Sequence, residues 1–329
     1  MRILVTGGAG YVGSHCVRGL CEAGHEVLVY DDLVHRGHRE AVDRRAALII
    51  ADLADGPRLD RTFAEGRFAA VMHFAASAEV GESVREPLSY YRNNVVNTVS
   101  LLEVMQRHQV RKLVFSSSCA VYGVPPAMPI TEDMPKNPIS PYGRTKLAIE
   151  WALQDCAAAW GLGATALRYF NAAGAAADAS LGEDHRPESH LIPRVLQVAL
   201  GQSASIQVFG DDYPTRDGSC VRDYVHVEDL SEVHLRAVET QVEGRFRAYN
   251  VGTGVGVTVK ELIATAREVT GCPIPAAVAP RRDGDPAELY ADARKVSTEL
   301  GWQARYTDIR RTLETAWKWH RDHPQGYRV

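Results

Sequence analysis

The sequence lacks several features that would set a protein apart from the ordinary globular class. Its 329 residues include six cysteines, but none forms a C-x-x-C pair or a spacing typical of metal ligands. No run of five like charges occurs, and 37 basic residues face 41 acidic ones, which disfavours a nucleic-acid surface. No stretch of 18 apolar residues could cross a membrane. We therefore expect free thiols, no metal site, no nucleic-acid partner and no membrane partner.

The beginning of the chain carries no pattern of a signal peptide. Its first apolar run, Ile3–Val5, ends at Thr6 and a glycine cluster. We expect a soluble, cytoplasmic protein. Hydrophobic residues make up 45% and charged residues 24%, and the length suits one large domain or two that share a cleft.

Short β-branched runs alternate with longer helical patterns in the first half of the chain. This order is typical of βαβ units, and the near-continuous hydrophobicity of the runs suits parallel strands covered on both faces. The expected strands are Arg2–Thr6, Glu26–Tyr30, Ala47–Ile50, Ala70–Phe74, Lys112–Ser116 and Ala164–Tyr169, and the expected helices are Tyr11–Ala23, Leu88–His108 and Pro141–Trp160.

We predict an α/β fold, a Rossmann-type doubly wound parallel sheet with a smaller, interleaved C-terminal α/β lobe. Residues 1–171, with parts of 222–256, would form the dinucleotide-binding domain. Residues 172–221 and 257–329 would form the substrate-binding lobe.

A glycine-rich turn follows the first strand and opens the first helix. Gly7, Gly10 and Gly13 have the spacing that allows a tight turn, close approach of a pyrophosphate and its binding at a helix N-terminus. Glycines alone also suit a simple strand–helix turn. Asp31, at the end of the second strand, could accept hydrogen bonds from ribose hydroxyls and repel a 2′-phosphate, which favours NAD over NADP. His35 and Arg36 nearby keep NADP open.

Other candidate cofactor contacts lie at the ends of the following strands. Asp52 could meet the adenine amino group while Leu53 packs on the ring, and the small residues after the fourth strand leave room for a ligand. The remaining candidates in these turns are Tyr11, Val12, Asp32, Phe74, Ala75 and Ala76.

Tyr142 and Lys146 are four residues apart at the start of a predicted helix, so their side chains share one face. A free phenol titrates near ~10, and an adjacent ammonium favours the phenolate, so the pair could transfer protons near neutral pH. Such a pair is also common on solvated helices. Ser118, in the serine run after the fifth strand, is the likeliest hydroxyl to face a reacting oxygen, and it makes the catalytic interpretation the better one.

Four strings in order carry a resemblance to a known family: Ser116–Gly123, Ser140–Lys146, Leu167–Asn171 and Val221–Val227. With the glycine loop, they resemble the extended short-chain dehydrogenase/reductase superfamily and, within it, the UDP-glucose 4-epimerases. The resemblance covers essentially the whole chain. It implies a tightly held NAD that removes hydride from C4 of a UDP-sugar and returns it to the opposite face, with Tyr142 as the base.

The resemblance also implies further site residues. Ser118, Tyr142 and Lys146 would touch the cofactor as well, together with Asn94 and Phe170. The substrate would be held by Ser118, Tyr142, Asn171, His190, Leu191, Phe209, Arg222, Arg282, Asp285 and Leu289. Guanidinium groups suit the diphosphate on independent grounds. Leu289 would stand where relatives carry a large Tyr or a small Cys that limits the sugar pocket.

Several alternatives stay open at this stage. Nucleotide-sugar 4,6-dehydratases and decarboxylases of the same superfamily need an acidic residue after the strand-five serine, where this chain has Cys119 and Ala120. An epimerase for UDP-N-acetylglucosamine or a UDP-pentose would share the catalytic motifs. A dinucleotide-sensing protein without catalysis would not need Ser118, Tyr142 and Lys146 together. Apolar residues on several faces of Leu88–His108 and Pro141–Trp160 also predict a homodimer joined by a four-helix bundle.

Overall fold

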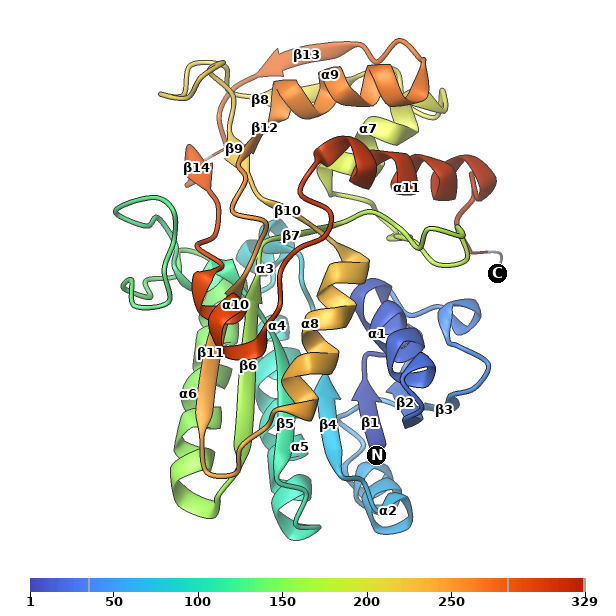
Figure 1. Cartoon of the computed structure of the whole chain (residues 1–329), viewed down its shortest axis with the longest axis vertical. Helices are drawn as coiled ribbons and strands as arrows, with labels where there is room; N and C mark the ends of the chain where they lie inside the picture. Colours follow the sequence, from blue (N-terminus) through green and yellow to red (C-terminus); the bar gives the residue numbers. More distant parts are fainter. Residues whose placement is uncertain (35, 283, 328–329) are drawn as a thin grey trace.

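A seven-stranded parallel sheet forms the centre of the molecule (Figure 1). The structure is a computed structural model, and it describes residues 1–34, 36–282 and 284–327. The strand order is β11-β6-β5-β4-β1-β2-β3. The strands are β1 (Arg2–Thr6), β2 (Glu26–Asp31), β3 (Ala47–Ile50), β4 (Ala70–His73), β5 (Lys112–Ser118), β6 (Gly163–Tyr169) and β11 (Phe246–Val251).

Helices cover both faces of this sheet, which confirms the doubly wound fold. On one face, α1 (Tyr11–Glu22), α8 (Val227–Glu239) and α10 (Arg294–Leu300) enclose a core that includes Val17, Leu230 and Trp302. On the other, α2 (Gly56–Gly66), α5 (Asn97–Arg107) and α6 (Pro141–Trp160) enclose a second core. The central strands β1, β4, β5 and β6 are thereby buried on both sides, as their continuous hydrophobicity predicts, whereas the edge strand β3 is partly exposed.

The sheet reverses its winding at β1, which has β2 on one side and β4 on the other. Parallel sheets of this kind bind ligands in the crevice beyond the carboxyl ends of the strands at such a reversal. The glycine loop follows β1 and therefore lies at this crevice.

A smaller lobe stands above the carboxyl edge of the sheet (Figure 1). It has a core of its own, with α7 (Leu191–Ala199), α9 (Val259–Thr270) and α11 (Ile309–Asp322) packed around it. Its short strands pair as β13-β8, β12-β9-β14 and β10-β7. Their bounds are β7 (Asn171–Ala173), β8 (Ile206–Phe209), β9 (Val221–Arg222), β10 (Tyr224–His226), β12 (Val257–Thr258), β13 (Ala276–Ala279) and β14 (Glu288–Leu289).

The chain passes between the two parts more than once. After β14 it returns to the main sheet, where α10 buries Val296 and Leu300 beside α8 and β11. The predicted division had placed these residues, within 257–329, in the smaller lobe. The chain returns there because α10 covers a face of β11 that would otherwise be open. The other boundaries of the predicted domains stay a prediction.

The predicted helix Leu88–His108 is divided into α4 (Pro87–Tyr90), a π-helical turn, η2 (Tyr91–Val96), and α5. A shorter helix, α3 (Val80–Arg85), precedes them, and 3-10 turns occupy η1 (Arg39–Ala41) and η3 (Cys119–Val121). All six cysteines are free. Among the described helices, none is both long and apolar enough to span a bilayer.

Candidate active site

The glycine loop packs so tightly against the end of β4 that side chains are excluded from it. Gly7 has a φ of +71°, and a Cβ there would lie 2.4 Å from the Ala75 nitrogen. A Cβ on Gly13 would lie 2.2 Å from the Gly7 carbonyl oxygen. A Cβ on Gly10, by contrast, would lie 3.5 Å from its nearest neighbour, the Gly7 carbonyl oxygen. The loop is therefore closed toward the sheet and open at Gly10.

The N-terminus of α1 starts at this open point. Gly10 is its N-cap residue and supplies no capping side chain, so the first N–H groups of the helix lack side-chain acceptors. Such groups bind phosphate well. The Tyr11 side chain points elsewhere and donates to the Gly174 carbonyl at 2.6 Å. Tyr11 and Val12 can thus offer backbone groups, and this cradle fits the pyrophosphate of a dinucleotide.

Asp31 is held beside the glycine loop at the end of β2. Its two carboxylate oxygens accept the backbone N–H groups of Ala9 and Leu33, both at 3.0 Å. Burial raises the pKa of Asp31, and these hydrogen bonds oppose the rise. Arg36 is paired with Glu79 at 2.8 Å. The arginine that kept NADP open is thus engaged elsewhere, and His35 lies outside the described residues.

The other candidates around the adenosine side have mixed environments. Asp32 accepts the Val34 N–H, and the exposed Asp52 accepts the Ala54 N–H. Leu53 is buried in the core beneath the sheet, with 6% of its surface exposed. Most of the Leu53 side chain is thus used for packing, which leaves little of it for an adenine ring.

Asn94 holds the chain that follows β4 against α6. It is fully buried, its amide nitrogen donates to the Ser77 carbonyl and to the Thr145 hydroxyl, and its oxygen accepts the Ser77 N–H. The sequence predicts Asn94 as a cofactor contact. In the structure its hydrogen bonds place Ala76 and Ser77 at the edge of the crevice.

Ser118 and Tyr142 meet at the carboxyl edge of the sheet, Ser118 at the end of β5 and Tyr142 in the first turn of α6. Proline at the start of α6 and the Ser140 cap fix where this helix begins. Burial raises the pKa of Tyr142 far above its usual range, while a hydrogen bond with Ser118 lowers it. Both side chains are 9% exposed, so each keeps a small face open to the crevice.

Lys146 lies one turn further along α6, as the spacing predicts. Its ammonium donates to the Ser116 carbonyl at 2.7 Å and lies 5.7 Å from the centre of the Tyr142 ring. Burial lowers the pKa of Lys146 to about 7, although Glu150 opposes this. Burial thus raises the pKa of Tyr142 and lowers that of Lys146, and the stabilisation of a phenolate by Lys146 stays a prediction.

A buried ion pair lies behind this site and is absent from the sequence predictions. The Arg168 guanidinium forms an ion pair with the Glu150 carboxylate, with 2.6 Å between Arg168 Nη2 and Glu150 Oε2. Glu150 also accepts a hydrogen bond from the Ser117 hydroxyl at 2.6 Å. Arg168 further donates to Tyr122. Glu150 is four residues beyond Lys146, so the same helical spacing that identified Lys146 could have found it.

Candidate substrate residues from the smaller lobe gather around β9 and β14. Arg222 of β9 pairs with Asp285, and the Arg282 guanidinium lies 3.9 Å from the centre of the Phe209 ring. Leu289 of β14 is the register partner of Arg222. The structure thus brings together five residues that are up to 80 positions apart in sequence.

The remaining candidates lie where the two parts of the molecule join. Asn171 donates to the Asp223 carbonyl, and Asp223 in turn donates its N–H to the Leu289 carbonyl. Phe170 is buried in the core of the main sheet. Leu191 begins α7, and the side chain of His190 faces a group of Glu and His residues rather than standing alone.

Comparison with known proteins adds to this geometry. Residues 3–252 match the profile of the NAD dependent epimerase/dehydratase family. The chain belongs to this family. A UDP-glucose 4-epimerase from Halalkalibacterium halodurans is 51% identical over 99% of this chain and 98% of its own length.

Solved structures agree with this assignment. A UDP-glucose 4-epimerase crystal structure matches the whole of both chains with a TM-score of 0.96 at 47% identity. Another, from Stenotrophomonas maltophila, has a TM-score of 0.94 at 42% identity, covers 99% of each chain and contains NAD and formylated UDP-arabinopyranose. The predicted resemblance to UDP-glucose 4-epimerases and the predicted fold class are confirmed.

Proposed function

We propose that this protein is an NAD-dependent UDP-glucose 4-epimerase, which interconverts UDP-glucose and UDP-galactose for galactose metabolism or UDP-sugar supply. The observation that carries the proposal is the meeting of Ser118, Tyr142 and Lys146 at the carboxyl edge of the main sheet, in a chain that matches such epimerases over its full length. Fold alone would not identify a reaction, whereas this set of side chains fits proton transfer next to a dinucleotide.

The residues that would hold NAD are those of the glycine loop and the edge beside it. Gly10 and the start of α1 would receive the pyrophosphate, Gly7 and Gly13 allow the tight turn, Asp31 would bind the adenosine ribose, and Lys146 would bind the second ribose. When bound, NAD would supply the hydride acceptor and donor and, in its oxidised form, a positive charge. The tight packing of Gly7 and Gly13 and the uncapped start of α1 support this fit.

Tyr142 moves the proton in the proposed reaction. Its Oη takes the proton of the C4 hydroxyl as the hydrogen on C4 departs as hydride, and it returns the proton when the hydride is restored on the other face. Ser118 shares this proton path through its hydrogen bond with Tyr142. Burial of the site excludes water, so the phenol and the ammonium of Lys146 interact in a medium of low polarity.

Substrate recognition is assigned to the smaller lobe. We propose that Arg222 and Arg282 bind the diphosphate, which carries about two negative charges. Asp285 forms an ion pair with Arg222, and the Arg282 guanidinium stacks on the Phe209 ring. Asn171 and Leu191 complete the pocket, and Leu289 limits the room beside the sugar.

Dehydration or decarboxylation would need an acid next to Ser118. Cys119 stands there, and burial raises the pKa of its thiol to about 12. Such a thiol neither donates nor accepts a proton readily near neutral pH. This supports epimerisation over the elimination reactions of the superfamily.

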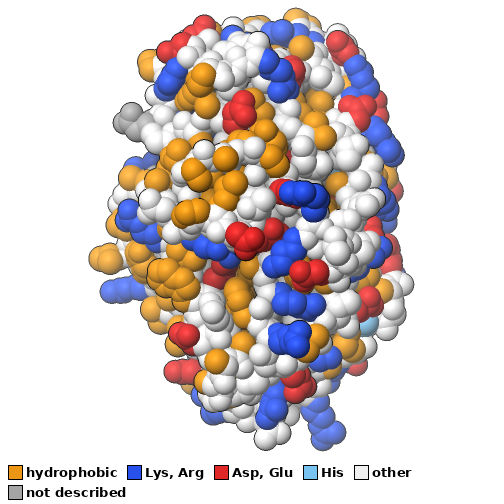
Figure 2. Space-filling model, turned by 60° about the vertical axis from the view of Figure 1, so that its left-hand side comes forward, with side chains coloured by type: hydrophobic (Ala, Val, Ile, Leu, Met, Phe, Trp, Pro, Cys, Tyr) orange, Lys and Arg blue, Asp and Glu red, His pale blue; other side chains and the backbone are white. Residues whose placement is uncertain are grey.

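We further propose a homodimer through η2, α5 and α6, and a cytoplasmic location, with which the six free cysteines agree. Val96, Val99 and Trp151 are exposed, Trp151 by 60%. Figure 2 shows hydrophobic side chains in patches on the side of the molecule where α6 lies. In two copies of the chain, the helix formed by η2 and α5 would pack with α6 as a four-helix bundle about a two-fold axis. Light scattering should give twice the mass of the chain.

The test of the function is a panel of UDP-hexoses, UDP-N-acetylhexosamines and UDP-pentoses with separation of the products. We expect UDP-galactose to be converted to UDP-glucose, and the ultraviolet spectrum of the protein to show bound dinucleotide with little free NADH. A 4-keto-6-deoxy sugar as the product, or no turnover of any UDP-sugar, would contradict the proposal.

A further inference from the structure

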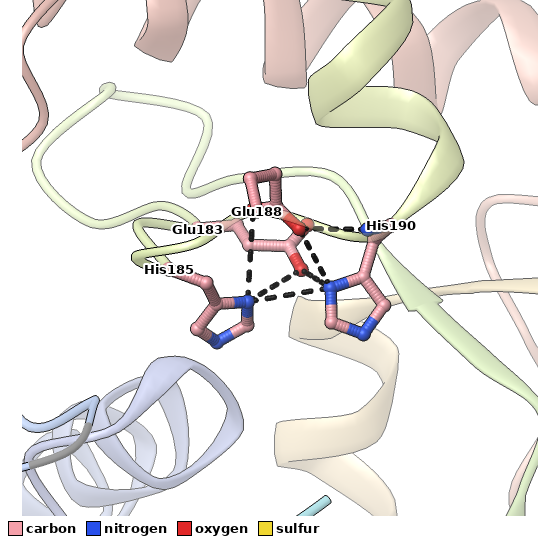
Figure 3. A group of neighbouring side chains, drawn as sticks. All are labelled: Glu183, His185, Glu188 and His190. Carbon is pink, nitrogen blue, oxygen red and sulfur yellow. Dashed lines mark hydrogen bonds and ion pairs between the residues drawn. The ribbon is translucent and has the colours of Figure 1, made fainter. Parts of the chain in front are cut away.

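Two glutamates and two histidines converge in the segment between β7 and α7 (Figure 3). The Glu183 Oε1 atom lies 3.2 Å from His185 Nδ1 and 3.0 Å from His190 Nδ1. Glu188 approaches the same two nitrogens with different oxygens: its Oε2 lies 3.7 Å from His185 Nδ1 and its Oε1 lies 2.9 Å from His190 Nδ1. The two nitrogens are 3.3 Å apart. One ligand atom from each of the four residues can be chosen so that all four lie within 4.8 Å of one another.

These distances are close to the separations between the ligands of a tetrahedral zinc ion. Zn–N bonds of 2.0–2.1 Å and Zn–O bonds of 2.0–2.2 Å place neighbouring ligand atoms about 3.3–3.6 Å apart. The five nitrogen–oxygen and nitrogen–nitrogen distances of the cluster run from 2.9 to 3.7 Å, and the four ligand atoms lie within 4.8 Å of one another. Rotations of the two glutamate side chains would bring one oxygen of each to bonding distance.

The carboxylates have only imidazoles as ion-pair partners. The side chains of Glu183 and Glu188 are only 6% and 5% exposed. Within the described part of the chain, their ion pairs are with His185 and His190 alone, and no Lys or Arg contributes. Two buried carboxylates and two neutral imidazoles carry a charge of −2, which a divalent cation would balance.

We propose that Glu183, His185, Glu188 and His190 form a zinc site. Two imidazole nitrogens and two carboxylate oxygens are a donor set that suits Zn²⁺. Four protein ligands leave no open position, so the role is structural rather than catalytic. The His190 side chain is 44% exposed and gives the ion a route from solvent. The sequence analysis expected no metal, because it considered cysteine spacing and not the pattern Glu-x-His-x-x-Glu-x-His.

The surroundings show what such an ion would stabilise. The Nε2 atom of His190 lies 4.0 Å from Glu79, which is itself paired with Arg36 and accepts the Ser189 hydroxyl. The His185 ring stands edge-on to Tyr11, with 6.3 Å between ring centres. The zinc would therefore fix the segment 183–190 against the glycine loop and set the start of α7, which immediately follows.

A metal-free alternative is a cluster held by protonated histidine. Burial lowers the pKa of His190, but Glu183 and Glu188 raise it to about 11. In that case zinc would bind weakly or not at all, because it would have to displace the proton. Metal content decides between the two states without any reference to activity.

The experiment uses the full-length protein without a polyhistidine tag, stripped with a chelator and then titrated with Zn²⁺ or Co²⁺ alone. We expect one zinc per chain by mass spectrometry of the metal, and the intense visible absorption of tetrahedral Co²⁺. His185→Ala should lower the occupancy at least ~10-fold. Glu188→Gln, which can still accept the N–H groups of Ser189 and His190, should do the same in a chain that folds normally.

The matched control is His108→Gln, which alters a histidine–carboxylate pair with Asp60 beyond the end of α5. It should bind zinc like the parent. The proposal is overturned if the stripped parent takes up no zinc, if the His185 and Glu188 variants bind as much as the control, or if Co²⁺ gives only the weak spectrum of an octahedral ion.

Discussion

The main sheet and the smaller lobe build their parts of the site in different ways. At the edge of the sheet, Ser118, Tyr142 and Lys146 are buried on a long strand and a long helix, and Lys146 donates a hydrogen bond to the Ser116 carbonyl. In the lobe, Arg282 is exposed, and Leu289 and Asp285 are half-buried on strands of two residues or on loops. A rigid edge suits chemistry that needs fixed atoms, and the looser lobe suits recognition of a ligand that enters and leaves.

This contrast predicts separate kinetic consequences. Substitutions at the sheet edge should lower kcat, because the lost interactions act in the transition state. Substitutions in the lobe should raise KM or change the choice of sugar.

The largest effect is expected for Tyr142→Phe, which removes the hydroxyl and keeps the ring. Loss of the base should lower kcat at least ~10²-fold while KM for UDP-galactose changes little. Steady-state kinetics with product separation measures both constants. A variant that works within a few-fold of the parent would show that another group moves the proton.

The next effect is expected for Arg222→Leu in the lobe. Loss of a charge-assisted hydrogen bond of about 1.5–3 kcal/mol should raise KM roughly 10- to 150-fold, with a smaller change in kcat. Arg222→Lys is the control that keeps the charge but not the planar guanidinium group. Its KM should lie between those of the parent and of Arg222→Leu. If Arg222→Leu changed kcat and left KM unchanged, the proposed contrast between catalysis at the sheet edge and recognition in the lobe would be wrong.

A narrower effect concerns the sugar pocket at Leu289. An N-acetyl group adds an amide that the apolar leucine cannot pair, at a cost of ~1–3 kcal/mol, so the parent should prefer UDP-glucose over UDP-N-acetylglucosamine by roughly 5- to 150-fold. Leu289→Tyr should abolish the second activity and spare the first, whereas Leu289→Cys should raise it. The ratio of kcat/KM for the two substrates measures this, and equal ratios in all three proteins would show that Leu289 does not limit the pocket.

The smallest effect is on stability and belongs to the main sheet. His234 of α8 is buried against Phe74, and burial lowers its pKa from 6.5 to about 4. Between these values the unfolded chain binds more protons than the folded one, so stability falls on acidification, by about 2 kcal/mol from pH 7 to 5 for this residue. Denaturant unfolding should show that His234→Leu loses this part of the pH dependence. Parallel curves for parent and variant would contradict it.

The sequence predicts the main sheet well because its signals are local. Strand periodicity, the glycines and the Tyr142–Lys146 spacing each need only a few neighbouring residues, and the family resemblance added the lobe residues. The helical spacing could have identified Glu150, but its pairing with Arg168 and the Asn94 hydrogen bonds depend on contacts between distant segments, so these contacts emerge only in the structure. The cluster around Glu183 is local in sequence, but its pattern has no cysteine and was therefore missed.

The π-helical turn and the return of α10 to the main sheet were also beyond sequence analysis. Periodicity over Leu88–His108 suits one continuous helix, and nothing in it marks the change of hydrogen bonding at η2. Trp302 is buried in the core between the sheet and α1, α8 and α10. Its position depends on the surface that β11 leaves open, and this surface exists only once the sheet has assembled.

The most direct test of the proposed reaction is the fate of the hydrogen at C4. UDP-galactose labelled with deuterium at C4 is incubated with the protein in ordinary water, and the UDP-glucose formed is analysed by mass spectrometry and NMR. If the hydride leaves C4 and returns to it inside a water-excluding site, the product keeps the deuterium at C4. Loss of the label to solvent, or its appearance at another carbon, would contradict the proposed epimerisation.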